Sequence, residues 1–244
     1  MIRIRIVIVG LLAAAWLLAG AGDTLAQDAP GSRPAPPRPP LRPGSIELDA
    51  GALWLSGIDF GSTTASILRN QTPATSYPLF KTASEMKPAP ALEARLGWRV
   101  TRVLGIEGAF RYARPALETR ISGDVENAVS VDATTDLSQY VAEVSGVVHL
   151  TLFRIGRYGS PFVLGGAGYM RELDDMKVLV ETGWLYHAGG GFKYMYSERT
   201  RGLVRGLGIR GDARLYFRDG GYDLADSSEL RRHFAGGASL IVAF

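Results

Sequence analysis

From residue 45 to the C-terminus, the sequence alternates between apolar and other residues in eight separate segments. A period of two places successive side chains on opposite faces of a β-strand, whereas a helix would need a period near 3.6. We therefore expect an all-β fold with eight antiparallel strands. The segments span residues 45–58, 89–99, 103–114, 137–152, 161–171, 183–196, 203–217 and the C-terminal stretch that ends at Phe244.

Most segments have one apolar face and one charged face; at 161–171 both faces are apolar, which leaves the phase of that strand open. In the last segment, Phe234, Leu240 and Phe244 share the apolar face. A soluble β-sandwich would alternate in the same way, so other features must distinguish it from a membrane barrel. The charged positions of the other segments include Glu47, Asp49, Glu93, Arg95, Arg99, Glu107, Arg111, Glu143, Lys193, Arg210, Asp212 and Arg214.

Three features favour a transmembrane barrel. Aromatic residues gather near segment ends, as at Trp54, Trp98 and Trp184, and prolines avoid segment interiors. The connections also alternate in length. The short ones are 100–102, 153–160 and 197–202, and the long ones are 59–88, 115–136, 172–182 and 218–231. Short turns on one side, long loops on the other and aromatic girdles are typical of outer-membrane barrels.

An even number of strands places both ends of the barrel on one side, so that the first and last strands can pair. Closure of this kind removes the unpaired strand edges that hydrocarbon does not tolerate. The sequence therefore predicts an eight-stranded, up-and-down, antiparallel transmembrane β-barrel over residues 45–244. A ten-stranded version is the alternative, if the 59–88 loop hides a hairpin around Thr64–Arg69 and Ser76–Ser84.

Residues 1–26 have the pattern of a signal peptide: Arg3 and Arg5 precede an apolar run, and Thr24-Leu25-Ala26 offers a cleavage site. An uncleaved membrane anchor is the alternative. Residues 27–44 are rich in proline and predict an extended periplasmic linker. The chain has no cysteine, and its net charge of +3 is interspersed, which argues against nucleic acid as a partner. We expect a chain exported to the bacterial outer membrane.

The chain resembles the small outer-membrane barrels of the class of the OmpA transmembrane domain, OmpX and the opacity proteins. The resemblance rests on the alternation, on the run from Pro161 to Tyr169 and on the terminal Phe244. One departure is Ser239, where the barrel-assembly signal has glycine. The resemblance implies roles in envelope integrity, adhesion or surface interaction, and no shared catalytic residue. It also implies that outer-membrane lipid surrounds the barrel and that the assembly machinery reads the strand ending at Phe244.

The charged faces predict a network inside the barrel, because an eight-stranded barrel is just wide enough to be filled by side chains. Buried charges must be paired or solvated, so we expect a salt-bridged plug, with a narrow charge-lined channel as the alternative. In particular, Arg210 or Arg214 should pair with Glu47, Asp49 or Glu107. The predicted network consists of Glu47, Asp49, Glu93, Arg95, Glu107, Arg111, Glu143, Lys193, Arg210, Asp212 and Arg214.

The grouping of Glu143, Ser145 and His149 on one strand raises the alternative of a lipid-acting enzyme. Same-face neighbours on a strand lie about 7 Å apart, which is long for a proton relay. The glycine pattern at 206–211 lies within an alternating strand and lacks the helix that a dinucleotide site requires. We therefore expect no catalytic, cofactor or metal residues, and a monomeric, non-enzymatic barrel whose surface ligand the sequence does not identify.

Overall fold

The computed structural model describes residues 43–69, 75–123, 129–151, 153, 159–174, 180–198, 202–220 and 230–244. The predicted signal peptide at 1–26 and nearly all of the predicted linker at 27–44 lie outside these residues. Within the described residues, no helix is long and apolar enough to cross a membrane.

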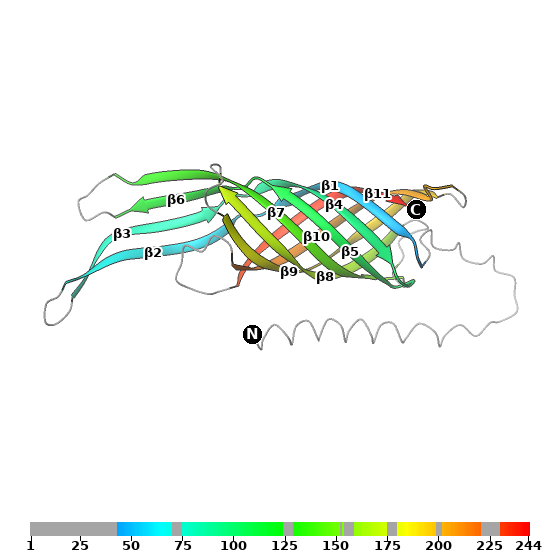
Figure 1. The fold of residues 1–244 in the computed structure, drawn as a ribbon, viewed down its shortest axis with the longest axis horizontal. Helices are drawn as coiled ribbons and strands as arrows, with labels where there is room; N and C mark the ends of the chain where they lie inside the picture. Colours follow the sequence, from blue (N-terminus) through cyan, green and yellow to red (C-terminus); the bar gives the residue numbers. More distant parts are fainter. Residues whose placement is uncertain are drawn as a thin grey trace, which may run out of the picture.

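Eight antiparallel strands form a closed wall (Figure 1). Neighbours along the chain or across a connection pair in the order β1, β4, β5, β7, β8, β9, β10 and β11, and β11 returns to pair with β1. The predicted eight-stranded antiparallel barrel is confirmed. The strands are β1 (Ile46–Leu55), β4 (Ala89–Arg99), β5 (Leu104–Ala113), β7 (Val131–His149), β8 (Gly159–Asp174), β9 (Val180–Glu198), β10 (Gly206–Gly220) and β11 (Arg231–Ala243).

Three further strands extend beyond one end of the wall: β2 (Ile58–Arg69), β3 (Thr75–Met86) and β6 (Ala116–Ser122). They pair in the order β2, β3, β6, and β6 pairs with Val131–Asp136 at the start of β7. We call these four strand segments the extension. Figure 1 shows them projecting from the end of the barrel opposite the C-terminus.

The hairpin of the ten-stranded alternative exists, but its place in the wall was wrong. β1 pairs directly with β4 from Ile46↔Trp98 to Leu55↔Ala89, which leaves no position for two strands between them. The β2–β3 hairpin therefore leaves the wall at the end of this pair where Leu55 meets Ala89. The ranges 59–88 and 115–136 were also wrong as plain loops, because they contain β2, β3, β6 and the start of β7.

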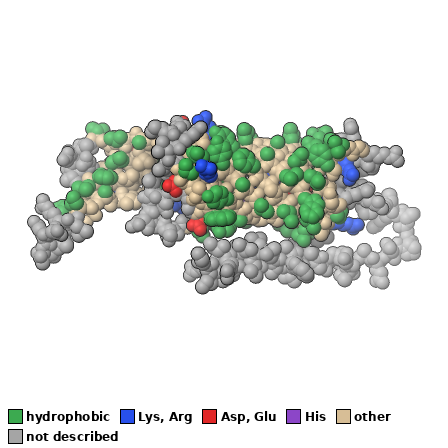
Figure 2. All heavy atoms as spheres, in the orientation of Figure 1, with side chains coloured by type: hydrophobic (Ala, Val, Ile, Leu, Met, Phe, Trp, Pro, Cys, Tyr) green, Lys and Arg blue, Asp and Glu red, His purple; other side chains and the backbone are tan. Residues whose placement is uncertain are grey.

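The two faces of the wall have the predicted phase. Leu92, Val144 and Leu240 are more than 60% exposed on the outside, whereas the charged residues that alternate with them are buried inside. Figure 2 shows hydrophobic side chains over the barrel surface, with charged side chains near its ends. The open phase at 161–171 is resolved as well, because Phe162 is buried in the interior and Tyr169 is exposed.

Aromatic side chains on the outer surface gather near the strand ends, and several contact each other across strands. Tyr112 on β5 lies with its ring centroid 5.0 Å from that of Tyr140 on β7. The rings of Tyr169 on β8 and Trp184 on β9 meet edge to face at 5.6 Å. Aromatic pairs of this kind hold neighbouring strands in register and suit the interface between hydrocarbon and water.

The outward phase predicts the effect of placing a charge on the wall. Val144 lies near the middle of the barrel portion of β7 and is 63% exposed. We expect Val144→Arg to lower the free energy of unfolding by about 2–4 kcal/mol, because the guanidinium would enter hydrocarbon near mid-depth. Denaturant unfolding from phospholipid vesicles measures this loss.

The matched control is Thr134→Arg, on the same strand but in the extension, where the side chain is exposed. Its free energy of unfolding should change by less than about 0.5 kcal/mol. Equal losses in both variants would contradict the placement of the outer surface in hydrocarbon.

Candidate functional site

The barrel interior holds the candidate site, because alternation points every second side chain of each strand inward. Glycine at selected inward positions makes room for the large charged side chains. A Cβ added to Gly191 on β9 would lie 2.2 Å from the Gly211 carbonyl oxygen and 2.7 Å from Asp212 Cβ. Only glycine allows β9 and β10 to approach this closely beside the interior carboxylate.

Near the C-terminal end of the barrel, Lys193 links two strands that are distant in sequence. Its Nζ donates to Glu47 Oε2 at 2.6 Å and to Glu107 Oε1 at 3.0 Å. Arg99 lies beside the same acid, with Nη2 3.7 Å from Glu47 Oε1, and it also contacts His149 Nδ1 at 3.2 Å. This layer connects β1, β4, β5, β7 and β9 across the interior.

Arg210 occupies the next layer and contacts three carboxylates. Its Nη1 lies 2.8 Å from both oxygens of Glu107 and 3.3 Å from Asp49 Oδ2, and its Nε donates to Asp212 Oδ2 at 2.7 Å. Its side chain has no exposed surface. The sequence-based expectation named Asp49 and Glu107 among the possible partners of Arg210, and both are in contact with it.

Arg214 forms a second centre one step further along β10. It donates to Glu93 at 2.9 Å, to Glu143 at 3.3 Å and to Asp212 at 3.1 Å, so the acids expected for one of the two arginines contact Arg210 and not Arg214. Arg95 also binds this group, through Asp212 at 2.9 Å and through Glu93. Two arginines and three acids thus form one continuous network that fixes three strands, β4, β7 and β10, to each other.

Arg111 is held mainly by an aromatic ring. Its guanidinium carbon lies 4.6 Å from the centre of the Tyr216 ring, and its Nη1 lies 3.5 Å from Glu143 Oε1. His233 stacks on the Tyr216 ring with centroids 5.0 Å apart. All eleven residues of the predicted network are buried inside the barrel, and Tyr216, which alternates on β10 with the same phase as Arg210, Asp212 and Arg214, is buried with them.

An apolar cluster lies in the part of the interior toward the extension. It includes Leu53, Val141, Met170 and Leu185, all at most 4% exposed. Glu172 on β8 forms a bidentate pair with Arg218 on β10, with one contact at 2.9 Å. Arg111 lies opposite Val141 and Arg218 lies opposite Leu185 in the strand pairing, so apolar and charged side chains share this part of the interior.

The extension closes the end of the barrel with a separate apolar cluster. Phe60, Met86, Leu117 and Leu137 are buried there, from strands β2, β3, β6 and β7. The guanidinium carbon of Arg231 lies 4.6 Å from the centre of the Phe60 ring. The base of the extension thus covers the mouth of the barrel with hydrophobic side chains.

Ser145 meets a histidine that the sequence did not pair with it. Its Oγ lies 2.9 Å from His187 Nε2, and His187 Nδ1 lies 3.8 Å from Glu143 Oε2. The expected partner, His149, contacts Arg99 instead. The pairing registers place Ser145, Gly166 and His187 in one row across β7, β8 and β9.

Gly166 explains why the sequence did not reveal this contact. A Cβ on Gly166 would lie 2.1 Å from the Val144 carbonyl oxygen and 3.0 Å from His187 Cε1, so glycine is required between the two side chains. A serine, an imidazole and a carboxylate in this order can relay a proton. All three are buried, and Glu143 is also bound by Arg214, so the relay faces other protein groups.

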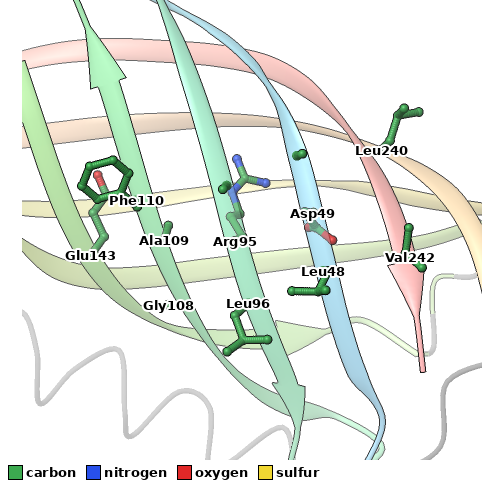
Figure 3. A pocket seen from close by; sticks show the side chains of 12 residues that line it. Leu48, Asp49, Arg95, Leu96, Gly108, Ala109, Phe110, Glu143, Leu240 and Val242 are labelled. Atoms are coloured by element: carbon green, nitrogen blue, oxygen red, sulfur yellow. The ribbon is translucent and has the colours of Figure 1, made fainter. Parts of the chain in front are cut away.

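Among the described residues, no group of histidine and acidic side chains has the arrangement of a metal site. A hollow with a volume of about 780 Å³ lies on the outer wall over β11, β1, β4 and β5 (Figure 3). Its sides are formed mainly by apolar residues, among them Leu48, Leu96, Phe110 and Leu240. This hollow opens toward the surroundings of the barrel and suits hydrocarbon better than a polar ligand.

The network predicts that Arg210 is important for stability. Arg210→Ala would leave Asp49, Glu107 and Asp212 without their shared partner, and we expect a loss of about 3–5 kcal/mol in the free energy of unfolding. The control Arg120→Ala removes an exposed pair with Asp132 and should cost less than about 1 kcal/mol. Denaturant unfolding in vesicles compares the two, and similar small losses would refute an interlocked interior.

No family model and no curated protein matches this chain. Solved structures do match. The outer membrane protein OprG from Pseudomonas aeruginosa is 12% identical, with a TM-score of 0.48, over 83% of this chain and 95% of that one. Ail, the attachment invasion locus protein of Yersinia pestis, is also 12% identical, with a TM-score of 0.39, over 83% and 99%.

A second structure of Ail, in complex with the heparin analogue sucrose octasulfate, is 16% identical, with a TM-score of 0.42. Likenesses this distant carry no conclusion about ligands, and the class of the protein follows from its own architecture. The wall is closed, its outer surface is apolar, its interior is charged, and its longest connections stand at one end. The chain has the architecture of the small outer-membrane β-barrel proteins.

Proposed function

We propose that this outer-membrane barrel is a non-enzymatic anchor that presents its extension and neighbouring connections at the cell surface, for envelope integrity, adhesion or surface interaction. The observation that supports this most directly is the contrast between the two halves of the molecule. The interior is filled by interlocked side chains, whereas the extension projects beyond the wall as a paired sheet. Such a molecule offers more contact surface outside the barrel than within it.

The proposal includes the route by which the chain reaches the membrane. A signal peptide cleaved after Ala26 would release a chain beginning at Gln27. The assembly machinery would then recognise β11, whose last described residues alternate toward Phe244. Ser239, which stands where the assembly signal has glycine, pairs with a glycine on the neighbouring strand, Gly51 on β1. A Cβ added to Gly51 would lie 2.5 Å from the Cβ of Ser239. A small residue is thus kept on one side of the seam.

A channel is the second candidate, because charged side chains line much of the interior. We expect no conductance from the folded wild-type protein, since the interlocked ion pairs, together with apolar side chains such as Leu53 and Met170, would fill the narrow interior. Planar-bilayer recording measures this, with a known porin as the positive control. Reproducible conductance steps from the wild-type protein would contradict the anchor function and support a channel.

A lipid-acting enzyme is the third candidate, and the Ser145–His187–Glu143 contact is the observation in its favour. We expect no difference in envelope lipids between cells that carry the wild-type protein and cells that carry Ser145→Ala. The burial of Ser145, at 5% exposure, keeps its hydroxyl away from lipid. Mass spectrometry of extracted lipids tests this, and a lipid species that disappears with the hydroxyl would identify an enzyme.

A further inference from the structure

The charges inside the barrel balance when its histidines are neutral. Within the described residues, the buried charged side chains are equal numbers of acids and bases, so their formal charges cancel. A proton taken up by a buried histidine would therefore add a positive charge that no spare acid compensates. The acids are Glu47, Asp49, Glu93, Glu107, Glu143, Glu172 and Asp212, and the bases are Arg95, Arg99, Arg111, Lys193, Arg210, Arg214 and Arg218.

All three histidines of the chain lie in this interior. His149, His187 and His233 are at most 6% exposed. The pairing registers place His187 and His233 on either side of Tyr216, in one row across β9, β10 and β11 toward the extension. His149 lies in the layer of Lys193 and Arg99, near the C-terminal end of the barrel. The two ends of the charge network thus contain histidine.

His149 accepts a hydrogen bond from a cation. Arg99 Nη2 lies 3.2 Å from His149 Nδ1, and a guanidinium can only donate, so this ring nitrogen must carry no proton. The acid nearby, Glu107, is already bound by Lys193 and Arg210. A proton on His149 would break the bond from Arg99 and place two cations in contact. The charged groups that face this imidazole from the other strands are Arg99, Glu107, Lys193 and Arg210.

The other two histidines share an aromatic ring with an arginine. The centre of the Tyr216 ring lies 5.3 Å from that of His187, 5.0 Å from that of His233 and 4.6 Å from the guanidinium carbon of Arg111. With both imidazoles neutral, Arg111 is the one cation of this group. Protonation of either histidine would place a second cation against the same ring.

The acids near Tyr216 are already shared among arginines. Glu143 lies 3.8 Å from His187 Nδ1, but it also contacts Arg111 and Arg214. The charged groups that face His187 are Glu93, Arg111, Glu143 and Arg214. Those that face His233 from the described strands are Arg111 and Arg218, and Arg231 stands two positions away on its own strand.

We propose that the three histidines make the interior of this barrel sensitive to acid: proton uptake drives the side chains of the charge network apart and admits water, while the wall stays closed. The wall is retained because its backbone hydrogen bonds have no substitute in hydrocarbon. The interior side chains can instead rotate and be hydrated from the two ends. The inference concerns the interior of the barrel and goes beyond the proposed anchor function.

The direction of the effect follows from proton linkage. In water an imidazole takes up a proton at about pH 6.5, so the unfolded chain binds three protons below that pH. The closed interior, which keeps its histidines neutral, binds fewer. The closed state is therefore fully favoured above about pH 6.5 and loses stability as the pH falls. Each such histidine raises the unfolding equilibrium constant about tenfold per pH unit, in a range where carboxylates stay ionised.

Denaturant unfolding of the full-length folded protein in phosphatidylcholine vesicles, at pH 7.5 and at pH 5.5, tests the role of the histidines. The unfolding equilibrium constant of the wild type should rise about tenfold or more at the lower pH. The triple variant His149→Gln, His187→Gln, His233→Gln keeps polar side chains that cannot be protonated, and its constant should change less than about threefold. Each protein is compared with itself, so a general loss of stability in the variant does not enter.

The matched control is Thr134→His, which adds an exposed imidazole to the extension. This imidazole is hydrated in the folded and the unfolded chain alike, so the control should keep the pH dependence of the wild type. An equal pH dependence in the wild type and the triple glutamine variant would overturn the proposal, as would a wild type that does not respond to pH.

Thiol labelling tests whether the interior opens while the wall persists. The chain has no cysteine, so Ser239→Cys gives a single thiol beside Arg210, at a hydroxyl that is buried, and Thr134→Cys gives an exposed reference. The labelling rate of the first relative to the second, with a small neutral disulfide reagent, should rise about tenfold or more from pH 7.5 to pH 5.5. Dividing by the reference removes the effect of pH on the thiol itself.

Heat-modifiable gel mobility shows whether the barrel is still folded at each pH. An unchanged labelling ratio would overturn the proposed opening, and so would a wild type that loses its folded mobility at pH 5.5, because the wall would then fail together with the interior. The proposed anchor function fails separately, through conductance or altered envelope lipids, which these two experiments do not measure.

Discussion

The pairing of β1 with β11 is the constraint on which the rest of the molecule depends. In hydrocarbon, a backbone amide or carbonyl without a partner costs several kcal/mol, so an open sheet with two free edges is not stable there. The register from Glu47↔Ala243 to Leu55↔Ala235 satisfies both edges at once. Once this seam is closed, the number of strands and the diameter of the interior are fixed.

A fixed, narrow interior forces the charged side chains into contact with each other. Each inward acid or base must find a partner within the barrel, because little room remains for bulk water. The strands therefore share partners: Glu107 binds both Lys193 and Arg210, and Asp212 binds both Arg210 and Arg214. This sharing couples distant strands and gives the wall a cross-linked core in place of a hydrophobic one.

The extension is released from both constraints. Outside the membrane its edges can be solvated, so β2, β3 and β6 need not close into a ring. The extension still alternates, but with its charges on the outer face and its apolar residues on the inner face, the reverse of the wall below it. The reversal occurs along β7 without a break in the strand, because the surroundings change from hydrocarbon to water.

The sequence by itself determined the class of the fold, the eight wall strands and the inward residues of every strand except 161–171, because a period of two fixes the face of each side chain locally where the two faces differ in polarity. It did not determine which inward residues meet. Ser145 reaches His187 because Gly166 stands between them on β8, and Arg214 reaches Glu143 across the interior; both contacts depend on register between strands that are distant in sequence.

The extension was likewise decided only by the tertiary structure. The alternation over 59–88 is compatible with a hairpin that forms part of the barrel wall and with one that projects beyond its end. The alternating pattern of these residues does not distinguish the two arrangements. The direct pairing of β1 with β4 leaves the hairpin no place in the wall, and β3 instead finds β6, from a separate connection. Such a choice depends on which strands meet in space, because a strand's pairing partner is set by closure of the whole ring and not by its own residues.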